Sequence, residues 1–354
     1  MTVDLPLIHR WIWDETVTLP DPETVLDAAS ALIERRSLDT AASLLDRAWG
    51  AKPTHRALQD ARARLLDQLS VTEHSIHFRY IPAGWYRQGS EDGDEDEQPR
   101  RRVELDAFWI AEEPLTWTQV AALADLTPPP ELQAKSDPPL DQDQFDRDRL
   151  VGFFNRRIIE IYCTVATDTP PSEMNRAQPR RWVERTADAY AVLPAVGFNH
   201  ETALRFVKAR AEGLFEYDLP TEAQWERAAR GGLPDARYPW GDTEPSPRLA
   251  DFDRFEQFSI RPVRETPPNG YGLFGVAGGV REWCADWYDA LEYQQIASRN
   301  PTGPSTGVQR VARGGSWADC AAALRVSFRS AFTSGPYWND PSVGLRPIRR
   351  VRRA

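Results

Sequence analysis

From about Val71 onward, the sequence alternates short segments with glycine, proline and acidic turns, and this texture limits the fold more than any other feature. Segments such as HFRYI and RVELDAFWIA have the length and the alternation of strands. Two stretches, 200–213 and 221–232, have helical periodicity, and Thr221 is placed to cap the second. The texture predicts an irregular α+β domain in which short strands and loops dominate.

A small helical region is predicted before this domain. Three stretches carry apolar residues three and four positions apart: 25–36, 39–50 and 54–69. Asp39 and Thr54 lie where N-caps would lie. The stretch holds no cluster of catalytic side chains, so we interpret residues 1–74 as a packing or docking region and residues 75–354 as the main domain.

An insertion interrupts the main domain at about residues 127–190. The span 127–169 is rich in proline, aspartate and glutamine around one predicted helix at 148–162. Long irregular segments of this kind are uncommon inside compact domains, so we expect the insertion to lie outside the domain core.

Composition excludes several classes of protein. The 43 basic and 53 acidic residues give a net charge of -10, so no general affinity for nucleic acid or anionic membranes is expected. No apolar run approaches the roughly 20 residues of a membrane span, and the acidic first residues do not resemble a secretion signal. Three widely spaced cysteines predict neither a disulfide scaffold nor a cysteine-based zinc site. We expect a cytoplasmic protein.

The acidic run at 91–97 invites a calcium-loop interpretation, which its spacing does not support. Counted from Asp92, an EF-hand loop needs glycine at the sixth position and a carboxylate at the twelfth, and the chain has Glu97 and Val103 there. We expect a solvated loop that pairs partly with the arginines at 100–102.

Seven strings in a fixed order resemble the formylglycine-generating enzyme family, also called the sulfatase-modifying factor domain, over roughly residues 75–350. The strings are FRYIPAGWYRQGS, EQPRRRVELDAFWI, LPTEAQWERAARGG, YPWG, PPNGYGLFGVAGGVREW, RVARGGSW and GLRP. The resemblance implies a single irregular domain of the C-type-lectin-like kind. Most of its glycines and tryptophans are interpreted as scaffold, because they suit tight turns and supply large apolar faces.

The residues that carry the family's chemistry differ here. The resemblance implies a motif for the active site: formylglycine-generating enzymes carry Gly-Gly-Ser-Tyr/Trp-x-Cys, with a second cysteine five positions later. The two thiolates bind copper. Without a gap, the string GGSWADCAAAL places Asp319 and Leu324 at these positions. If Arg325 and Arg329 set the register instead, the loop is shorter than in the family and at most Cys320 lies nearby. The related sulfoxide synthases hold iron through histidines, and none of the five histidines here forms an H-x3-H pair. Neither copper nor iron is expected.

The resemblance also implies a structural calcium ion, with ligands drawn partly from GLFGVAGGVREW. Gly275 replaces the usual acid or amide, which removes one ligand. The carbonyl groups of Gly278 and Val280 and the carboxylate of Glu282 remain as candidate ligands, although Ca²⁺ prefers six to eight oxygens.

Two functions are weighed. The first is a catalytically silent module that binds a protein or peptide ligand through the C-terminal loops, a region that also resembles the variable region of diversity-generating-retroelement target proteins. Its candidate residues are Trp317, Asp319, Arg325, Phe332, Tyr337, Trp338, Asn339 and Asp340. Alternatively, Arg325 belongs to the shared scaffold, and Tyr337 and Trp338 pack inward. The second function is an oxidase or oxygenase of the same superfamily that acts on a peptide or amino-acid-derived substrate.

Overall fold

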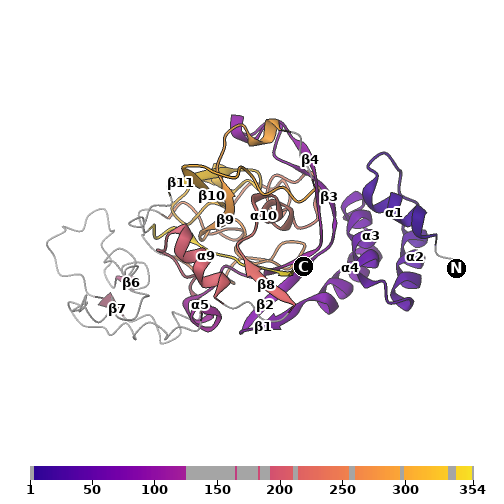
Figure 1. Cartoon of the computed structure of the whole chain (residues 1–354), viewed down its shortest axis with the longest axis horizontal. Coiled ribbons are helices and arrows are strands. Elements are labelled where there is room, and N and C mark those ends of the chain that lie inside the picture. Colours follow the sequence, from indigo (N-terminus) through magenta and orange to yellow (C-terminus); the bar gives the residue numbers. More distant parts are fainter. Residues whose placement is uncertain are drawn as a thin grey trace.

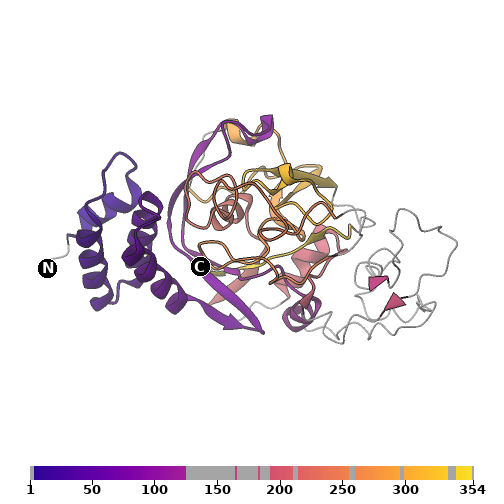
Figure 2. The ribbon, with the colours of Figure 1, turned by 180° about the vertical axis from the view of Figure 1, so that it is seen from behind.

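The computed structural model of the protein describes residues 4–124, 164–165, 182–183, 192–209, 214–254, 260–295, 299–333 and 340–352. Helices near the N-terminus stand beside a rounded domain of short strands and loops, and the view from behind shows the same arrangement (Figures 1 and 2). Within the described part of the chain, no helix is long and apolar enough to cross a membrane.

The N-terminal region contains four helices rather than the predicted three. They are α1 (Leu5–Trp13), α2 (Pro22–Glu34), α3 (Leu38–Ala51) and α4 (Arg56–Leu69). The three predicted helices are confirmed within a few residues, and α1 was missed.

Two predicted N-caps are wrong. The N-cap of α3 is Ser37, two residues before the predicted Asp39, and α4 is capped by the ring of His55 rather than by Thr54. Asp39 instead lies in the first turn of α3 and accepts a hydrogen bond of 2.7 Å from the hydroxyl of Tyr80. The tertiary contact with the neighbouring strand therefore uses the side chain that the local pattern assigned to a cap.

Two sheets form the frame of the main domain. The first has the order β1-β2-β5-β13-β8, and all its neighbouring strands are antiparallel: β1 (Val71–Glu73), β2 (Ile76–Ile81), β5 (Phe108–Ala111), β13 (Ile348–Val351) and β8 (Phe215–Asp218). The C-terminal strand β13 lies between β5 and β8. The first sheet thus needs segments from both ends of the domain, as the order of the sequence strings predicts.

The second sheet positions the candidate site. Its order is β11 (Arg329–Thr333), β10 (Gln309–Arg313), β9 (Arg281–Trp287) and β12 (Val343–Gly344). Strand β12 pairs with β9 in parallel, while the other pairs are antiparallel. Two further pairs are β3 (Gly84–Gln88) with β4 (Arg101–Leu105), and β6 (Thr164–Val165) with β7 (Trp182–Val183).

Three helices lie in the described part of the main domain: α5 (Trp117–Ala124), α9 (His200–Lys208) and α10 (Glu222–Ala229). Thr221 caps α10 in a capping box with Gln224, which confirms that prediction. The helix predicted at 148–162 lies outside the described residues, as does the 127–190 insertion apart from β6 and β7.

One hydrophobic cluster crosses the proposed boundary at residue 74. It contains Leu32 and Leu45 from the helices together with Tyr80, Ile110 and Trp225 from the main domain. Strands β3 and β4 run along the side of the domain that faces the helices (Figure 1). The N-terminal region therefore packs as part of the same core.

The acidic run is only partly solvated, and its partners differ from those predicted. Glu97 is fully buried, and its carboxylate pairs with the guanidinium of Arg325, which also pairs with Asp94 at 3.1 Å. The nearby arginines Arg100 and Arg101 pair with acids distant in the sequence. Long-range contacts thus replace the expected local pairing.

Candidate binding site around Arg281

Two of the predicted binding residues, Asp319 and Phe332, contact a side chain that sequence reasoning did not assign to the site, and Asp340 is linked to it through Ser342. That side chain is Arg281, the first residue of β9, whose backbone N–H donates to the carbonyl oxygen of Ser342 at 2.8 Å beside β12. The parallel pairing of β9 with β12 brings segments 281–287 and 340–344 together.

A chain of polar contacts passes through Arg281. Its guanidinium forms an ion pair with Asp319 and donates to Ser342 Oγ at 2.8 Å. Ser316 Oγ donates to Asp319 Oδ2 at 2.7 Å, and the hydroxyl of Ser342 donates to Asp340. The Arg281 and Asp319 side chains are each partly exposed. One guanidinium thus lies between two carboxylates near the surface.

Aromatic side chains support this polar chain. Phe332 lies under the guanidinium of Arg281, 5.0 Å from it to the ring centroid, and contacts Trp283 edge-on at 6.1 Å. Trp317 is buried and donates from Nε1 to the carbonyl oxygen of Pro341 at 3.3 Å. We name the group of Arg281, Ser316, Asp319, Phe332, Asp340 and Ser342 the Arg281 cluster.

The remaining predicted residues do not join the Arg281 cluster. Arg325 pairs with Glu97 and Asp94, which agrees with the interpretation of this arginine as scaffold. Tyr337, Trp338 and Asn339 lie outside the described residues. One signal in the sequence could have drawn attention to the centre of the cluster: Arg281 is the one basic residue of the string GLFGVAGGVREW.

At the two positions that correspond to the family's thiols, this chain has an ion-paired residue and a core residue. Asp319 is paired with Arg281, and Leu324 is fully buried in a small apolar cluster. Cys320 is exposed and free. Cys284 is buried in β9, and burial raises the pKa of its thiol well above the usual value.

Glu282, the one side chain among the predicted calcium ligands, has other partners. Glu282 is fully buried, and its two carboxylate oxygens accept hydrogen bonds from Arg346 at 2.8–3.0 Å and from Trp225 Nε1 at 2.6 Å. The guanidinium of Arg346 therefore already balances the charge of Glu282, and three N–H groups occupy most of its lone-pair sites. Within the described ranges, no three His, Cys, Asp or Glu side chains converge in a way that could hold a metal ion.

A buried carboxyl group lies near the other end of β9, beside the start of α10. Asp286 in β9 accepts a hydrogen bond of 2.8 Å from the backbone N–H of Glu222. Burial, together with the negative charge of Glu222, raises the pKa of Asp286 to about 8. The carboxyl group of Asp286 is therefore protonated in the native state near neutral pH.

This shift predicts a pH dependence of stability. An aspartate of the unfolded chain titrates near pH 4, so between about pH 4 and 8 the native state holds a proton that the unfolded state has released. The contribution of Asp286 is present in full below that interval and is lost as the pH rises through it. We expect Asp286→Asn, measured by urea unfolding, to become more stable relative to the parent between about pH 5 and pH 8. Parallel pH profiles of the two proteins would contradict the assignment.

Comparison with known proteins defines the class first. The Sulfatase-modifying factor enzyme 1-like domain matches residues 68–351, so the chain belongs to this family. Its sequence is 47% identical to the formylglycine-generating enzyme of Thermomonospora curvata over 115 residues, which cover 28% of this chain and 38% of that enzyme. The chain thus matches well under half of the length of this relative.

Two solved structures share the fold. Treponema denticola variable protein 1 has a TM-score of 0.50 and 24% identity, and the match covers 79% of this chain and 97% of that one. PvdO from Pseudomonas aeruginosa has a TM-score of 0.55 and 18% identity over 80% of this chain and 98% of that one. These two matches confirm the fold, and the family match with the sequence identity above confirms the resemblance to formylglycine-generating enzymes.

Proposed function

We propose that this chain is a catalytically silent member of its family that binds a protein or peptide ligand through the Arg281 cluster. The observation that carries the proposal is which residues stand at the two positions that correspond to the family's thiols. Asp319 belongs to a polar chain at the surface, and Leu324 belongs to the core. A site for thiolate chemistry is thereby replaced by a site with hydrogen-bonding groups.

The chemistry of the Arg281 cluster suits a peptide. Its partly exposed guanidinium and carboxylates offer donors and acceptors side by side, and a peptide backbone carries both kinds of group. Phe332, which packs edge-on against Trp283, holds Arg281 from beneath, so little side-chain entropy remains to be lost on binding. Arginine and aromatic side chains are also the types enriched at binding hot spots.

Selection of linear peptides from a random displayed library tests the proposal. Peptides enriched on the parent protein are expected to lose roughly tenfold or more in affinity for Arg281→Gln, because a charged hydrogen-bonding group is lost. The matched control is Arg299→Gln, which removes an exposed arginine paired with Asp106 on the surface. Thermal melting of both variants shows that they are folded.

Enrichment of peptides that bind the parent and both variants equally would contradict the assignment of the site. Failure to enrich any peptide would contradict the proposed class of ligand.

A test of chemistry separates this function from its alternative, an oxidase or oxygenase. The purified chain, given Cu(I), oxygen and a cysteine-containing peptide, is expected to produce no aldehyde detectable by mass spectrometry. Cys320→Ser is expected to behave as the parent does, since the neighbours of this exposed thiol include Asp319 and no base. Stoichiometric copper in the purified protein, or an aldehyde that disappears in Cys320→Ser, would establish the oxidase instead.

A cytoplasmic location is proposed from the free thiols Cys284 and Cys320.

A further inference from the structure

The second sheet carries another arginine beside the Arg281 cluster. Arg310 in β10 lies opposite Phe332 of β11 on one side and opposite Trp287 of β9 on the other. Side chains that are directly opposite in an antiparallel pair point to the same face of the sheet. Phe332 also lies under the guanidinium of Arg281. The two arginines therefore have this ring as a common neighbour, and the Arg281 cluster continues across the sheet to Arg310.

The guanidinium of Arg310 is held in place and keeps one donor group for a ligand. It stacks on Trp287, 3.4 Å from the ring centroid, and Nη1 donates to the carbonyl oxygen of Ala285 at 2.7 Å. Arg310 Nε is enclosed by the protein, whereas Nη2 has no partner among the described residues and is not one of the enclosed nitrogen atoms. The Nη2 group of this partly buried side chain is therefore open to solvent.

The charge of Arg310 has no ionised partner within the part of the chain that the structure describes. Burial lowers the pKa of Arg310, and Asp286 opposes this shift. The side chain of Asp286 points to the opposite face of β9 from that of Trp287, and its carboxyl group is protonated near neutral pH. His200 is neutral at this pH, because burial and the charge of Arg310 lower its pKa to about 4. An unpaired positive charge thus reaches the surface at this end of the sheet.

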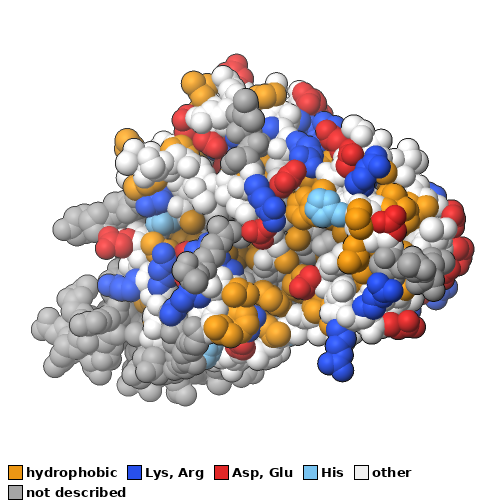
Figure 3. Space-filling view, turned by 45° about the vertical axis from the view of Figure 1, so that its right-hand side comes forward, with side chains coloured by type: hydrophobic (Ala, Val, Ile, Leu, Met, Phe, Trp, Pro, Cys, Tyr) orange, Lys and Arg blue, Asp and Glu red, His pale blue; other side chains and the backbone are white. Residues whose placement is uncertain are grey.

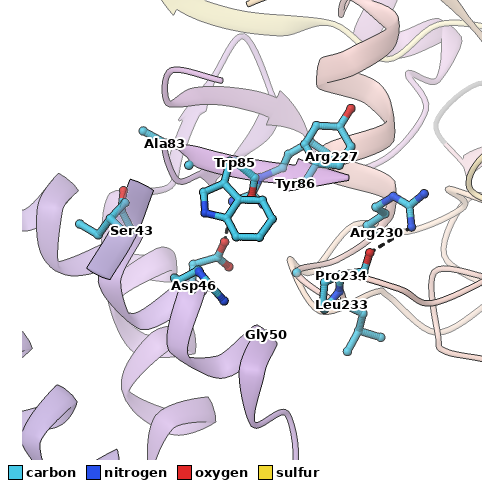
Figure 4. A pocket seen from close by; sticks show the side chains of 14 residues that line it. Ser43, Asp46, Gly50, Ala83, Trp85, Tyr86, Arg227, Arg230, Leu233 and Pro234 are labelled. Carbon is cyan, nitrogen blue, oxygen red and sulfur yellow. Dashed lines mark hydrogen bonds and ion pairs between the residues drawn. The ribbon is translucent and has the colours of Figure 1, made fainter. Parts of the chain in front are cut away.

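Other arginines have their counter-charge inside the protein. Burial also acts on Arg329 in β11, but its ion pair with Glu222 at 2.7 Å raises the pKa of Arg329 above its usual value. In the pocket where the N-terminal helices meet the main domain, Asp46 accepts hydrogen bonds of 2.8 Å from Arg62 Nε and Arg227 Nη2 (Figure 4). On the face that carries the helices, acidic and basic side chains are interspersed (Figure 3). Arg310 differs from these in having a charge that a ligand can balance.

We infer that the peptide-binding surface extends from the Arg281 cluster to Arg310, and that Arg310 binds the carboxylate of an aspartate or glutamate side chain of the ligand. This inference rests on the proposed function and narrows its ligand class to acidic peptides. Guanidinium and carboxylate groups form strong charge-assisted hydrogen bonds, and the stack on Trp287 fixes the plane in which Arg310 donates. Val308, two residues before Arg310, is 85% exposed and offers apolar contact to the rest of the peptide.

Selection from two displayed peptide libraries, with the full chain as the target, tests the inference. The first library encodes all amino acids, and the second encodes asparagine and glutamine in place of every aspartate and glutamate. Peptides enriched from the first library are expected to share an acidic residue. Each is then synthesised with an amidated C-terminus, and replacement of its acidic residue by the matching amide is expected to weaken binding to the parent about tenfold. Peptides from the second library are expected to bind more weakly than those from the first.

Variants of Arg310 identify the group that recognises the acid. Arg310→Gln is expected to weaken binding of the acidic peptides about tenfold and to remove the difference between each peptide and its amide form. Arg310→Lys keeps the charge without the planar guanidinium, so a smaller loss is expected. Arg310→Glu is expected to reverse the preference, so that lysine at the acidic position binds better than glutamate. Arg237→Gln is the matched control that leaves binding unchanged, because Arg237 stacks on Tyr238 outside the second sheet.

The outcomes separate this inference from the proposed function. Failure to enrich any peptide would overturn both. Peptides that lose affinity for Arg281→Gln but share no acidic residue, or that bind Arg310→Gln as tightly as the parent, would overturn the inference and leave the proposed function standing. Equal binding of an acidic peptide and its amide form to the parent would do the same, and this comparison needs no variant of the protein to fold.

Discussion

Glu282→Gln is expected to lower the free energy of unfolding by about 3–5 kcal/mol, because it leaves a buried guanidinium without its counter-charge. The side chains of Glu282 and Arg346 are 0% and 1% exposed, and three hydrogen bonds join them. Glutamine also presents an amide N–H₂ group where Arg346 or Trp225 donates. Urea unfolding at neutral pH measures the loss.

Glu216→Gln provides the matched control. Glu216 pairs with Arg350 at 2.6 Å, but the two side chains are 31% and 40% exposed. Its replacement is expected to cost less than about 1 kcal/mol, as surface ion pairs do. If chelation of calcium by EDTA abolished the difference between the parent and Glu282→Gln, then Glu282 would act as a calcium ligand and the ion-pair explanation would fail.

Asp46→Asn is expected to have an effect of similar size, about 3–5 kcal/mol, since two guanidinium groups depend on this one buried carboxylate. Arg62 comes from α4 and Arg227 from α10, so the substitution acts on the contact between the helical region and the main domain. Asp60→Asn, in an exposed pair with Arg56 within α4, is expected to change stability by no more than about 0.5 kcal/mol.

The form of the unfolding transition of Asp46→Asn tests whether the two regions share one core. We expect one cooperative transition at a lower urea concentration, because the hydrophobic cluster crosses residue 74 and Arg62 donates to the carbonyl oxygen of Gly270 at 2.6 Å. Two separated transitions, with the second at the urea concentration of the parent, would show that the helices form an independent unit.

Sequence patterns predicted the scaffold well because its elements depend on local chemistry. The helices at 25–36, 39–50 and 54–69 follow from the spacing of apolar residues, and Thr221 caps α10 through contacts within four residues. Asp39 shows the limit of such reasoning. Its side chain can cap a helix, but the strand β2 brings the hydroxyl of Tyr80 to it, and no local pattern records that approach.

The same limit explains the outcome at the candidate site. Trp317, Asp319, Phe332 and Asp340 belong to a single C-terminal stretch. Asp319 and Phe332 contact Arg281, which is far from them in the sequence, and Asp340 is linked to Arg281 through Ser342. Arg281 joins them because β12 lies beside β9 in parallel, a pairing that needs a long connection and leaves no short-range signal.

By itself, the sequence determined the family, the α+β class and the order of the main elements, because apolar spacing, turn residues and ordered strings are properties of neighbouring positions. Only the tertiary structure decided which charges meet: Glu282 with Arg346, Asp319 with Arg281, and Asp46 with both Arg62 and Arg227. The attraction between an arginine and an acidic residue depends little on the neighbouring sequence, so many different ion pairs are possible in a chain with this many arginines and acids. Burial and the pairing of strands decide which of these ion pairs form.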